Sequence, residues 1–489
     1  MYTKPIAVIL ILVASSAWVS AHDTGHHADM TRTTLTDLKF GEDAIRATQV
    51  ANWLTDYYSA PNSTVTKDEF EKLHFDDVFN TTDVRSYWNQ FAINTQAAVV
   101  QAAKDRDTLK FIMLLGLSLH TVQDFYTHSN WPEKHPRSAG YRTATWWSSP
   151  VSSDTDIYTG WYPNAMYPDR PSYSKQDHGD YFYGLNKDSY VRPKWDEGYI
   201  FAFAASEEWA IALCAWAEAA NPGFVDQVRA YQAGGNRSKL DYDVQASYRI
   251  SEWVSLGVFD DKVDGHWKGN HSGRIASFLP FVTAWMASPD SPYVKAVKTD
   301  RYQLLLTRGL YTKNAPSGAV PTIAPVKLDK VAVSVRTLHL NYVGSGGFTF
   351  SPTYYALLDL KSTSGNQSFI EAMQKRGAKD FDTSWWTMHF VDRANLVPGK
   401  SPVAVRYGLY NEDSGGWPLP GSSDRHFNIK GSNDQDKDIR FNFDPITQEC
   451  QGDINGVHDR EANAAAVSGK TNFSASAKLL IRSDPLVAR

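Results

Sequence analysis

The sequence predicts an α+β multidomain chain in which an N-terminal all-α domain precedes a C-terminal β-sandwich. Apolar residues recur at helical spacing over much of residues 31–229, whereas the alternation typical of half-buried strands begins at Lys330. Between these regions, residues 314–321 have the proline and small residues of a linker. We therefore expect a helical domain over residues 22–312, a linker over 313–329 and a β-sandwich over 330–489.

The most informative predicted helix runs from Thr108 to His128. Its residues are apolar almost all round as far as Leu119, a pattern that indicates a central, buried helix. Thr31 carries a hydroxyl of the kind that begins a helix. Further helices are expected over Asp43–Tyr58, Tyr87–Ala103, Tyr199–Ala220 and parts of 243–312.

Four segments of the C-terminal region have the composition of strands. The first alternates apolar and polar residues, the other three combine β-branched and aromatic residues, and turn-rich stretches separate one from the next. The segments are residues 330–338, 353–360, 385–391 and 403–410.

The N-terminus has the pattern of a secretory signal peptide over residues 1–21. Lys4 precedes an apolar run from Pro5 to Trp18, and small residues up to Ala21 form a cleavage site. Cleavage there would leave His22 as the first residue of the mature chain. We therefore expect a secreted or periplasmic protein.

The amino-acid composition limits the class of protein and the kinds of metal ligand that the chain can supply. The 489 residues include 42% hydrophobic and 21% charged residues, which indicates a globular chain. The net charge of −5 lacks the basic character that a stable nucleic-acid partner requires. The two cysteines, Cys214 and Cys450, form no zinc motif, so any metal must be held by histidine and carboxylate ligands.

His120, Asp124 and His128 follow one another at intervals of four residues. On a helix this spacing brings all three toward one face. Two imidazoles and a carboxylate suit a divalent ion such as zinc. The alternative is a hydrogen-bonded polar stripe, but burying three polar groups without a metal costs several kcal/mol if they are unpaired, which favours the metal site.

Other candidate ligands lie elsewhere in the chain. His22 and His27 belong to a histidine-rich segment at the expected mature N-terminus, where a free amine can also bind metal. Asp56 ends a predicted helix, where the helix dipole does not favour an acid. The remaining candidates are His74, His178 and Asp180.

The segment Leu117–Trp131 and the order of these candidates resemble the zinc-dependent phospholipase C and single-strand-specific nuclease superfamily. The similarity is to the branch of bacterial zinc phospholipases C and heterokaryon-incompatibility C-type proteins. It covers about residues 22–220 and implies a zinc phospholipase C-like fold for the N-terminal domain. It also implies three zinc ions, two of which Asp124 would bridge.

The resemblance implies a ligand set for each ion. One set contains Asp56, His74, His120 and Asp124, and another contains the His22 amine, His27 and Asp124. The second zinc would take His128, His178 and an acid four residues after His178. Phe182 occupies that position here, so Asp180 is the expected substitute. Asp56, as ligand or nearby base, would take the proton of the attacking water.

The implied reaction is hydrolysis of the glycerol-side phosphodiester of phospholipids such as phosphatidylcholine, giving diacylglycerol and a phosphorylated headgroup at a membrane surface. Tyr141, Trp146, Trp147 and Trp161 could surround a choline, stack on a nucleobase, or pack on the domain. Rival functions are a zinc-dependent nuclease or phosphoesterase, and a non-catalytic, zinc-stabilised incompatibility or adhesion protein. No protein partner is predicted.

The β-sandwich carries a candidate calcium site. Asp434, Asp436 and Asp438 occupy alternate positions, a spacing seen in calcium-binding loops. The loop lacks the glycine of such sites, so a solvated acidic turn remains the alternative. Some phospholipases of the family that the chain resembles carry a β-sandwich that binds membranes through calcium, so the resemblance implies this role for the site.

Overall fold

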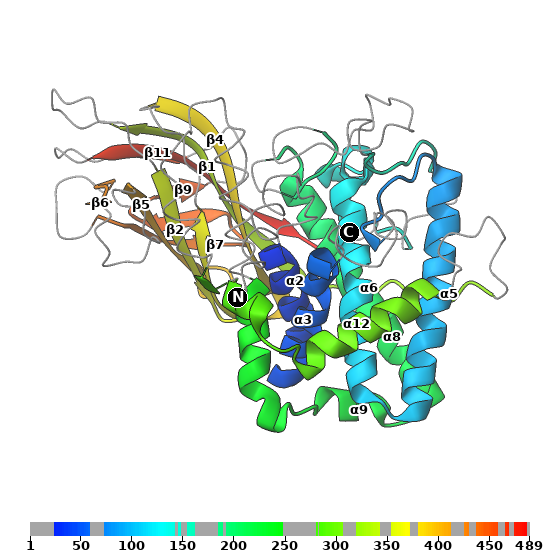
Figure 1. Ribbon diagram of the computed structural model, residues 1–489. Coiled ribbons are helices and arrows are strands. Elements are labelled where there is room, and N and C mark those ends of the chain that lie inside the picture. The colour runs from blue at the N-terminus through cyan, green and yellow to red at the C-terminus, as the bar shows by residue number, and fades with distance from the viewer. Residues whose placement is uncertain are drawn as a thin grey trace, which may run out of the picture.

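A computed structural model of the chain confirms the α+β class, with helices up to residue 306 and antiparallel strands from residue 330 (Figure 1). The structure describes residues 24–58, 73–141, 145–147, 154–161, 184–188, 192–247, 280–281, 283–306, 319–342, 354–371, 380–411, 425–429, 437–457, 465–468 and 474–486.

The helices pack around α6, which runs through the middle of the helical region (Figure 1). The helices are α2 (Thr24–Asp37), α3 (Glu42–Tyr58), α5 (Thr81–Asp105), α6 (Thr108–His128), α7 (Trp131–Lys134), α8 (Trp195–Ala220), α9 (Phe224–Arg229) and α12 (Pro292–Leu306). Short 3-10 turns are η1 (Arg137–Ala139), η3 (Gly234–Asn236) and η4 (Arg393–Asn395).

Helix α6 has the bounds expected from the sequence. The Asp107 carboxylate caps it by accepting from the Lys110 backbone N–H at 2.9 Å. Every residue from Phe111 to His128 is buried, as an apolar helix requires. At Gly116 a β-carbon would lie 2.5 Å from both Ala51 Cβ and the Thr48 carbonyl oxygen, so only glycine allows α3 to approach this closely. That approach brings α3 against the half of α6 that carries His120.

The first helix begins earlier than expected. Thr31 does not start a helix but lies inside α2, where its side chain is buried and accepts a hydrogen bond from Asn52 at 2.9 Å. The Thr31 hydroxyl therefore makes a hydrogen bond to another helix and does not cap the start of its own helix. Helix α8 has the length and hydropathy of a membrane-crossing helix, yet 78% of its most apolar window is buried inside the molecule.

The strands form two antiparallel sheets. One has the order β10-β11-β1-β4, and the other has the order β3-β2-β5-β7-β8-β9 with β6 paired to β5. The strands are β1 (Lys330–Tyr342), β2 (Tyr354–Ser362), β3 (Gly365–Glu371), β4 (Asp380–Asp392), β5 (Val403–Asn411), β6 (Arg425–His426), β7 (Ile439–Asp444), β8 (Glu449–Gly452), β9 (Gly456–Val457), β10 (Ala465–Ser468) and β11 (Ala475–Pro485).

The two sheets share one apolar core, which makes this region a β-sandwich. Val333 and Val335 of β1 alternate toward this core, as do Leu358 and Leu360 of β2. The four segments expected to be strands lie in β1, β2, β4 and β5. Alternation predicted β1, because this strand has one face in this core, and composition predicted the other three.

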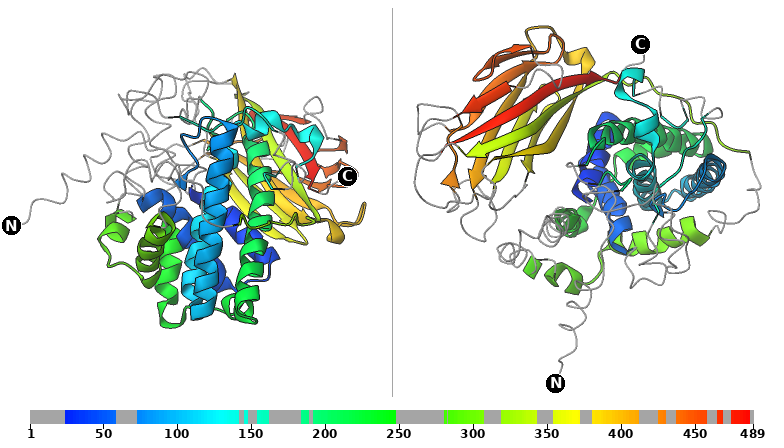
Figure 2. Two further views of the ribbon diagram at one scale, coloured as in Figure 1. Left: turned by 90° about the vertical axis from the view of Figure 1, so that its right-hand side faces the viewer. Right: turned by 90° about the horizontal axis from the view of Figure 1, so that it is seen from above.

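The four-stranded sheet also packs against the helices. Ala332, Met388, Phe390 and Leu480 belong to the same buried cluster as the helical core. The ring of Phe390 stacks on Phe203 of α8 with centroids 4.0 Å apart. The view from above shows the sandwich beside the helices (Figure 2). This apolar contact joins the sandwich to the helix that lies beside α6.

Candidate metal centre

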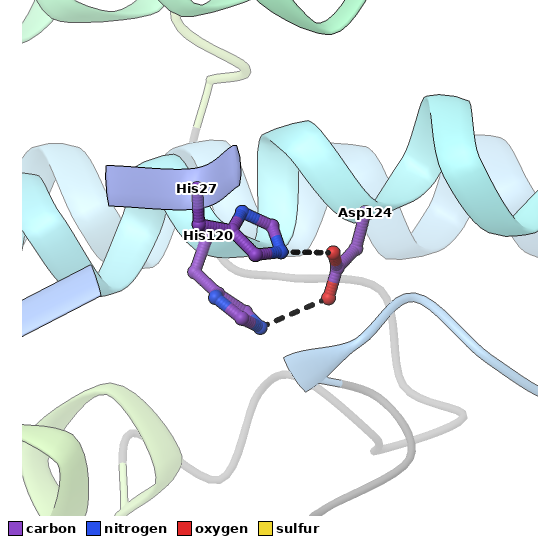
Figure 3. A group of neighbouring side chains, drawn as sticks. All are labelled: His27, His120 and Asp124. Atoms are coloured by element: carbon purple, nitrogen blue, oxygen red, sulfur yellow. Dashed lines mark ion pairs between the residues drawn. The ribbon is translucent and has the colours of Figure 1, made fainter. Parts of the chain in front are cut away.

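Three side chains from two helices converge in the helical core (Figure 3). His27 comes from α2, and His120 and Asp124 come from successive turns of α6. Asp124 Oδ1 lies 3.1 Å from His27 Nε2, and Asp124 Oδ2 lies 3.0 Å from His120 Nε2. All three side chains are fully buried. His27, His120 and Asp124 therefore form a group that can hold a metal ion.

His74 joins this group from a turn between α3 and α5. Its Nδ1 atom lies 2.8 Å from Asp124 Oδ2 and 3.1 Å from His120 Nε2. These three atoms therefore form a compact triangle of nitrogen and oxygen donors. The family resemblance implied that His74 lies with His120 and Asp124, and these three side chains are neighbours in the structure.

The turn that carries His74 has an unusual backbone. Phe75 and Asp77 have φ values of 58° and 57°, a left-handed region that costs free energy for residues other than glycine. Buried contacts stabilise it: the Phe75 ring packs 4.3 Å from Tyr87, and the Asp77 N–H donates to the Gly160 carbonyl at 2.8 Å. In this conformation both His74 and Asp76 reach residues of α6.

The charge states at His120 favour a cation in this group. Burial lowers the pKa of His120 to about 3, so its imidazole is neutral at neutral pH. Its Nδ1 atom lies 3.1 Å from the Asn52 side-chain oxygen, which only accepts, so Nδ1 carries the proton. Nε2 then presents a lone pair to the Asp124 carboxylate. Two acceptors facing each other at 3.0 Å repel unless a cation lies beside them.

Asp124 is ionised in spite of its burial. Burial raises its pKa, but the contacts with His120 and His27 lower it well below the usual range. With both rings protonated at Nδ1, these contacts favour the anion only when a cation lies between ring and carboxylate. A buried carboxylate with imidazoles at both oxygens has the donor atoms and the charge that a divalent metal requires.

His128 contacts a second group of carboxylates. Its Nε2 atom lies 3.0 Å from Asp188 Oδ1, and its Nδ1 atom lies 3.1 Å from Asp76 Oδ1 and 3.0 Å from the His74 carbonyl. Burial lowers the pKa of His128, but Asp76 and Asp188 raise it well above its usual value. His128 is about 12 Å further along the helix axis than His120 and is rotated by about 80°, so the predicted single stripe serves two adjacent groups.

Asp188 is held in place by the residues around it. The neighbouring Lys187 is buried, and its ammonium donates to the Ser129 carbonyl at 3.0 Å, near the end of α6. The same ammonium lies 3.0 Å from Glu133. Arg192 donates to the Asn186 carbonyl at 3.0 Å. These contacts keep residues 184–188 against α6 and present Asp188 to His128.

The structure describes only part of the predicted ligand set. His22, His178 and Asp180 lie outside the described residues. Asp56 lies within α3, one helical turn after Asn52, and its side chain is also outside the description.

Sequence reasoning missed four residues of the site: Asn52, Asp76, Gln123 and Asp188. The only local signal was the alternation of His74 with Asp76, which places the two side chains at related positions of an extended or turned segment. Nothing near Asp188, Asn52 or Gln123 distinguishes them from ordinary polar residues.

The aromatic residues suggested for a headgroup cage pack in the core instead. Tyr141 lies 5.1 Å from Phe201, and Trp147 lies 5.1 Å from Trp88. Trp146 is buried beside Phe125, 5.5 Å away. Trp161 is buried against Phe79. Each of these rings packs on other aromatic residues of the domain, so among the described residues they form no open cage.

The candidate calcium residue Asp438 is already engaged. One carboxylate oxygen lies 2.7 Å from His426 Nε2, and the other accepts from Arg406 Nε at 2.6 Å. Asp434 and Asp436 lie outside the described residues. Calcium binding through Asp438 would require both contacts to be replaced. The side chain is also buried, so Asp438 does not belong to a solvated acidic turn either.

No family model matches the sequence, and no curated protein is similar to it at a significant level. Among solved structures, human GIVD cytosolic phospholipase A2 in complex with methyl gamma-linolenyl fluorophosphonate has a TM-score of 0.20 and 10% identity. That match covers 32% of this chain and spans only 18% of the length of the phospholipase.

Two bacterial structures match over most of their length. The alpha toxin from Clostridium absonum has a TM-score of 0.17 and 11% identity, covering 83% of this chain and 98% of the toxin. The alpha-toxin of Clostridium perfringens, from avian strain SWCP, has a TM-score of 0.14 and 12% identity, covering 86% and 96%. TM-scores this low assign no function to the chain, so its function is inferred from the geometry of the candidate metal centre.

Proposed function

We propose that the protein is a secreted zinc metallophospholipase C that hydrolyses the glycerol-side phosphodiester of phospholipids. The observation that carries this proposal is the Asp124 carboxylate. One of its oxygens faces His27 and the other faces His74 and His120. A carboxylate in this arrangement suits two metal ions on its two sides, as in two-metal phosphodiester hydrolysis.

Zinc fits the donors. Imidazole nitrogens and carboxylate oxygens are its usual ligands where cysteine is absent. His74, His120 and Asp124 would hold one ion together with Asp56, and His27 and Asp124 would hold another together with the amine of His22. When bound, zinc lowers the pKa of a coordinated water from about 15.7 to about 7 and neutralises phosphoryl charge.

His128 would hold the second zinc of the proposed set. Asp188 supplies a carboxylate 3.0 Å from His128 Nε2, the role expected of Asp180 from the sequence. His178 completes this set in the proposal. Asp76 and the His74 carbonyl, on the opposite side of the ring, keep the imidazole oriented.

The remaining roles belong to the chain itself. Asp56 would accept the proton of the attacking water, as a base one helical turn beyond Asn52. Burial of every described ligand excludes bulk water and strengthens the electrostatic contacts of the site. The signal-like N-terminus supports export, and a phospholipid surface is the proposed partner. The β-sandwich, packed on α8 through Phe390, would keep that surface in a set orientation to the helices.

The test combines metal analysis with two substrates. The purified mature protein is assayed for zinc per chain, for phosphocholine release from phosphatidylcholine vesicles, and for cleavage of single-stranded DNA. We expect about three zinc ions and phosphocholine release that a chelator abolishes and zinc restores. Bound zinc with DNA cleavage alone would identify the nuclease alternative, and bound zinc with neither activity would identify a zinc-stabilised scaffold.

A further inference from the structure

The two histidines that face Asp124 are joined on their other side by a buried hydrogen-bond network. His27 Nδ1 lies 2.6 Å from the Gln123 side-chain oxygen, and His120 Nδ1 lies 3.1 Å from the Asn52 side-chain oxygen. Asn52 Nδ2 donates to the same Gln123 oxygen at 3.0 Å. Gln123 Nε2 donates to Ser206 Oγ at 3.1 Å. All these side chains are fully buried.

The contact that Ser206 makes at one end of the network determines which atom donates and which accepts in every other hydrogen bond. The Ser206 hydroxyl donates to the Ala202 backbone carbonyl at 2.7 Å, and a carbonyl can only accept. Ser206 therefore offers a lone pair to Gln123, so the amide nitrogen of Gln123 faces Ser206. The amide oxygen of Gln123 then faces His27 and Asn52.

The Asn52 amide links the Gln123 side chain to His120, and its orientation is also determined by its neighbours. The Asn52 amide nitrogen faces the Gln123 oxygen and also donates to Thr31 Oγ1 at 2.9 Å. The Asn52 oxygen therefore faces His120 Nδ1. Rotating either amide by 180° would oppose two donors or two acceptors, so the usual ambiguity of amide orientation does not arise here.

We propose that Gln123 and Asn52 are positioning residues that fix His27 and His120 in the Nδ1-protonated form and so preform the metal site. Each imidazole then presents the Nε2 lone pair to the side occupied by Asp124. The inference depends on the proposed function only in requiring that this site binds zinc.

The network also accounts for how helices distant in sequence are aligned at the site. It connects α2 through His27 and Thr31, α3 through Asn52, α6 through His120 and Gln123, and α8 through Ser206. Because neutral amides supply the acceptors, the network orients the rings without adding a buried charge. The two ligands are therefore oriented before the metal arrives.

The test compares three variants. Gln123→Met removes the acceptor of His27 while keeping a similar shape, and Gln123→Glu restores an acceptor at the same position. Gln49→Met is the matched control, because Gln49 is a buried amide of α3 that donates to the Ala28 backbone carbonyl of α2 at 2.9 Å. Zn2+ affinity is measured by competition with a chromophoric chelator.

We expect Gln123→Met to weaken the binding of one zinc ion about 10- to 100-fold, the usual cost of losing an orienting partner. Gln123→Glu should bind Zn2+ more tightly than Gln123→Met, because it keeps the acceptor of His27 although it loses the donor to Ser206. Gln49→Met should bind Zn2+ as the unchanged protein does. Equal losses in Gln123→Met and Gln123→Glu, or no loss in Gln123→Met, would overturn the proposal.

A second measurement reads the tautomers directly. In metal-free protein labelled with 15N-histidine, the shifts of His27 and His120 should report protonated Nδ1, and those of His27 should lose this signature in Gln123→Met. Nε2-protonated rings in the unchanged protein would refute the inference. Normal zinc binding without phospholipid hydrolysis would reject the proposed function and leave this inference standing.

Discussion

Two buried polar regions of the molecule are built from similar residues but have opposite requirements. At the metal centre, the Asp124 carboxylate faces neutral His120. Where the sandwich meets the helices, Lys330 of β1 lies 2.8 Å from Asp37 and 2.7 Å from Asp392, with Glu207 of α8 beside them. The interface region contains its own cation, the Lys330 ammonium. At the metal centre, by contrast, two hydrogen-bond acceptors face each other, the His120 Nε2 lone pair and the Asp124 carboxylate.

The presence or absence of a neighbouring cationic side chain indicates whether a carboxylate requires a cation from outside the chain. The carboxylates around Lys330 are compensated by its ammonium, so the cluster acts as an internal fastening between α2, α8 and the sandwich. Asp124 has no lysine or arginine contact among the described residues, and its histidines are oriented by neutral amides. A cation is therefore expected from solution.

Asp124→Asn is the largest change expected. An amide keeps the shape but cannot serve as an anionic bridge, so we expect the loss of about two zinc ions per chain and of all phospholipid hydrolysis. Zinc content by mass spectrometry of the native protein checks this. Unchanged zinc content would remove the bridging role from Asp124.

Asp188→Asn tests the intermediate case, in which His128 lies between two carboxylates. If Asp188 and His128 hold a metal, the variant should lose about one zinc ion and keep the two at Asp124. The same native mass measurement distinguishes the outcomes. If all the zinc remains, His128 with its raised pKa acts as the internal cation of this group, in the way that Lys330 does at the interface.

Lys330→Met removes the cation of the interface. We expect a loss of about 1–3 kcal/mol in the free energy of unfolding, because the partly exposed Asp37 and Asp392 lose the buried ammonium that they contact, with zinc content unchanged. Lys327→Met, at an exposed lysine of the same segment, is the matched control and should change stability by less than about 0.5 kcal/mol. Denaturant unfolding of the zinc-loaded protein measures both. Zinc loss in Lys330→Met would show that the two regions are coupled.

Glu207→Gln addresses the pH dependence of the interface. Burial raises the pKa of Glu207 well above the usual 4.5, and Asp37 raises it further. Its protonated form stabilises the fold at low pH, and this contribution is lost as pH rises from about 4.5 through the folded pKa. Glutamine resembles the protonated form, so stability should fall less steeply over that range. Parallel slopes of stability against pH in both proteins would contradict this.

Much of the fold could be predicted from local patterns. The apolar surface of α6 and the alternation in β1 each follow from burial of the element along its own length. The start of α2 could not be predicted, because Thr31 is used by Asn52, a residue 21 positions away. Which of the three alternatives held for the aromatic residues also depended on tertiary contacts, since Trp147 and Tyr141 pack on Trp88 of α5 and Phe201 of α8.

By itself the sequence determined that His120, Asp124 and His128 follow one another along a buried helix, because the helical period places them there. Only the tertiary structure decided their partners. His74 reaches Asp124 across 50 residues, Gln123 orients His27 across 96, and Asp188 meets His128 across 60. Spacing along one helix is a local property. The remaining residues of the candidate metal centre come from distant positions and reach it only after the helices have packed. The histidine stripe is therefore readable in the chain, and its division into two groups is a consequence of folding.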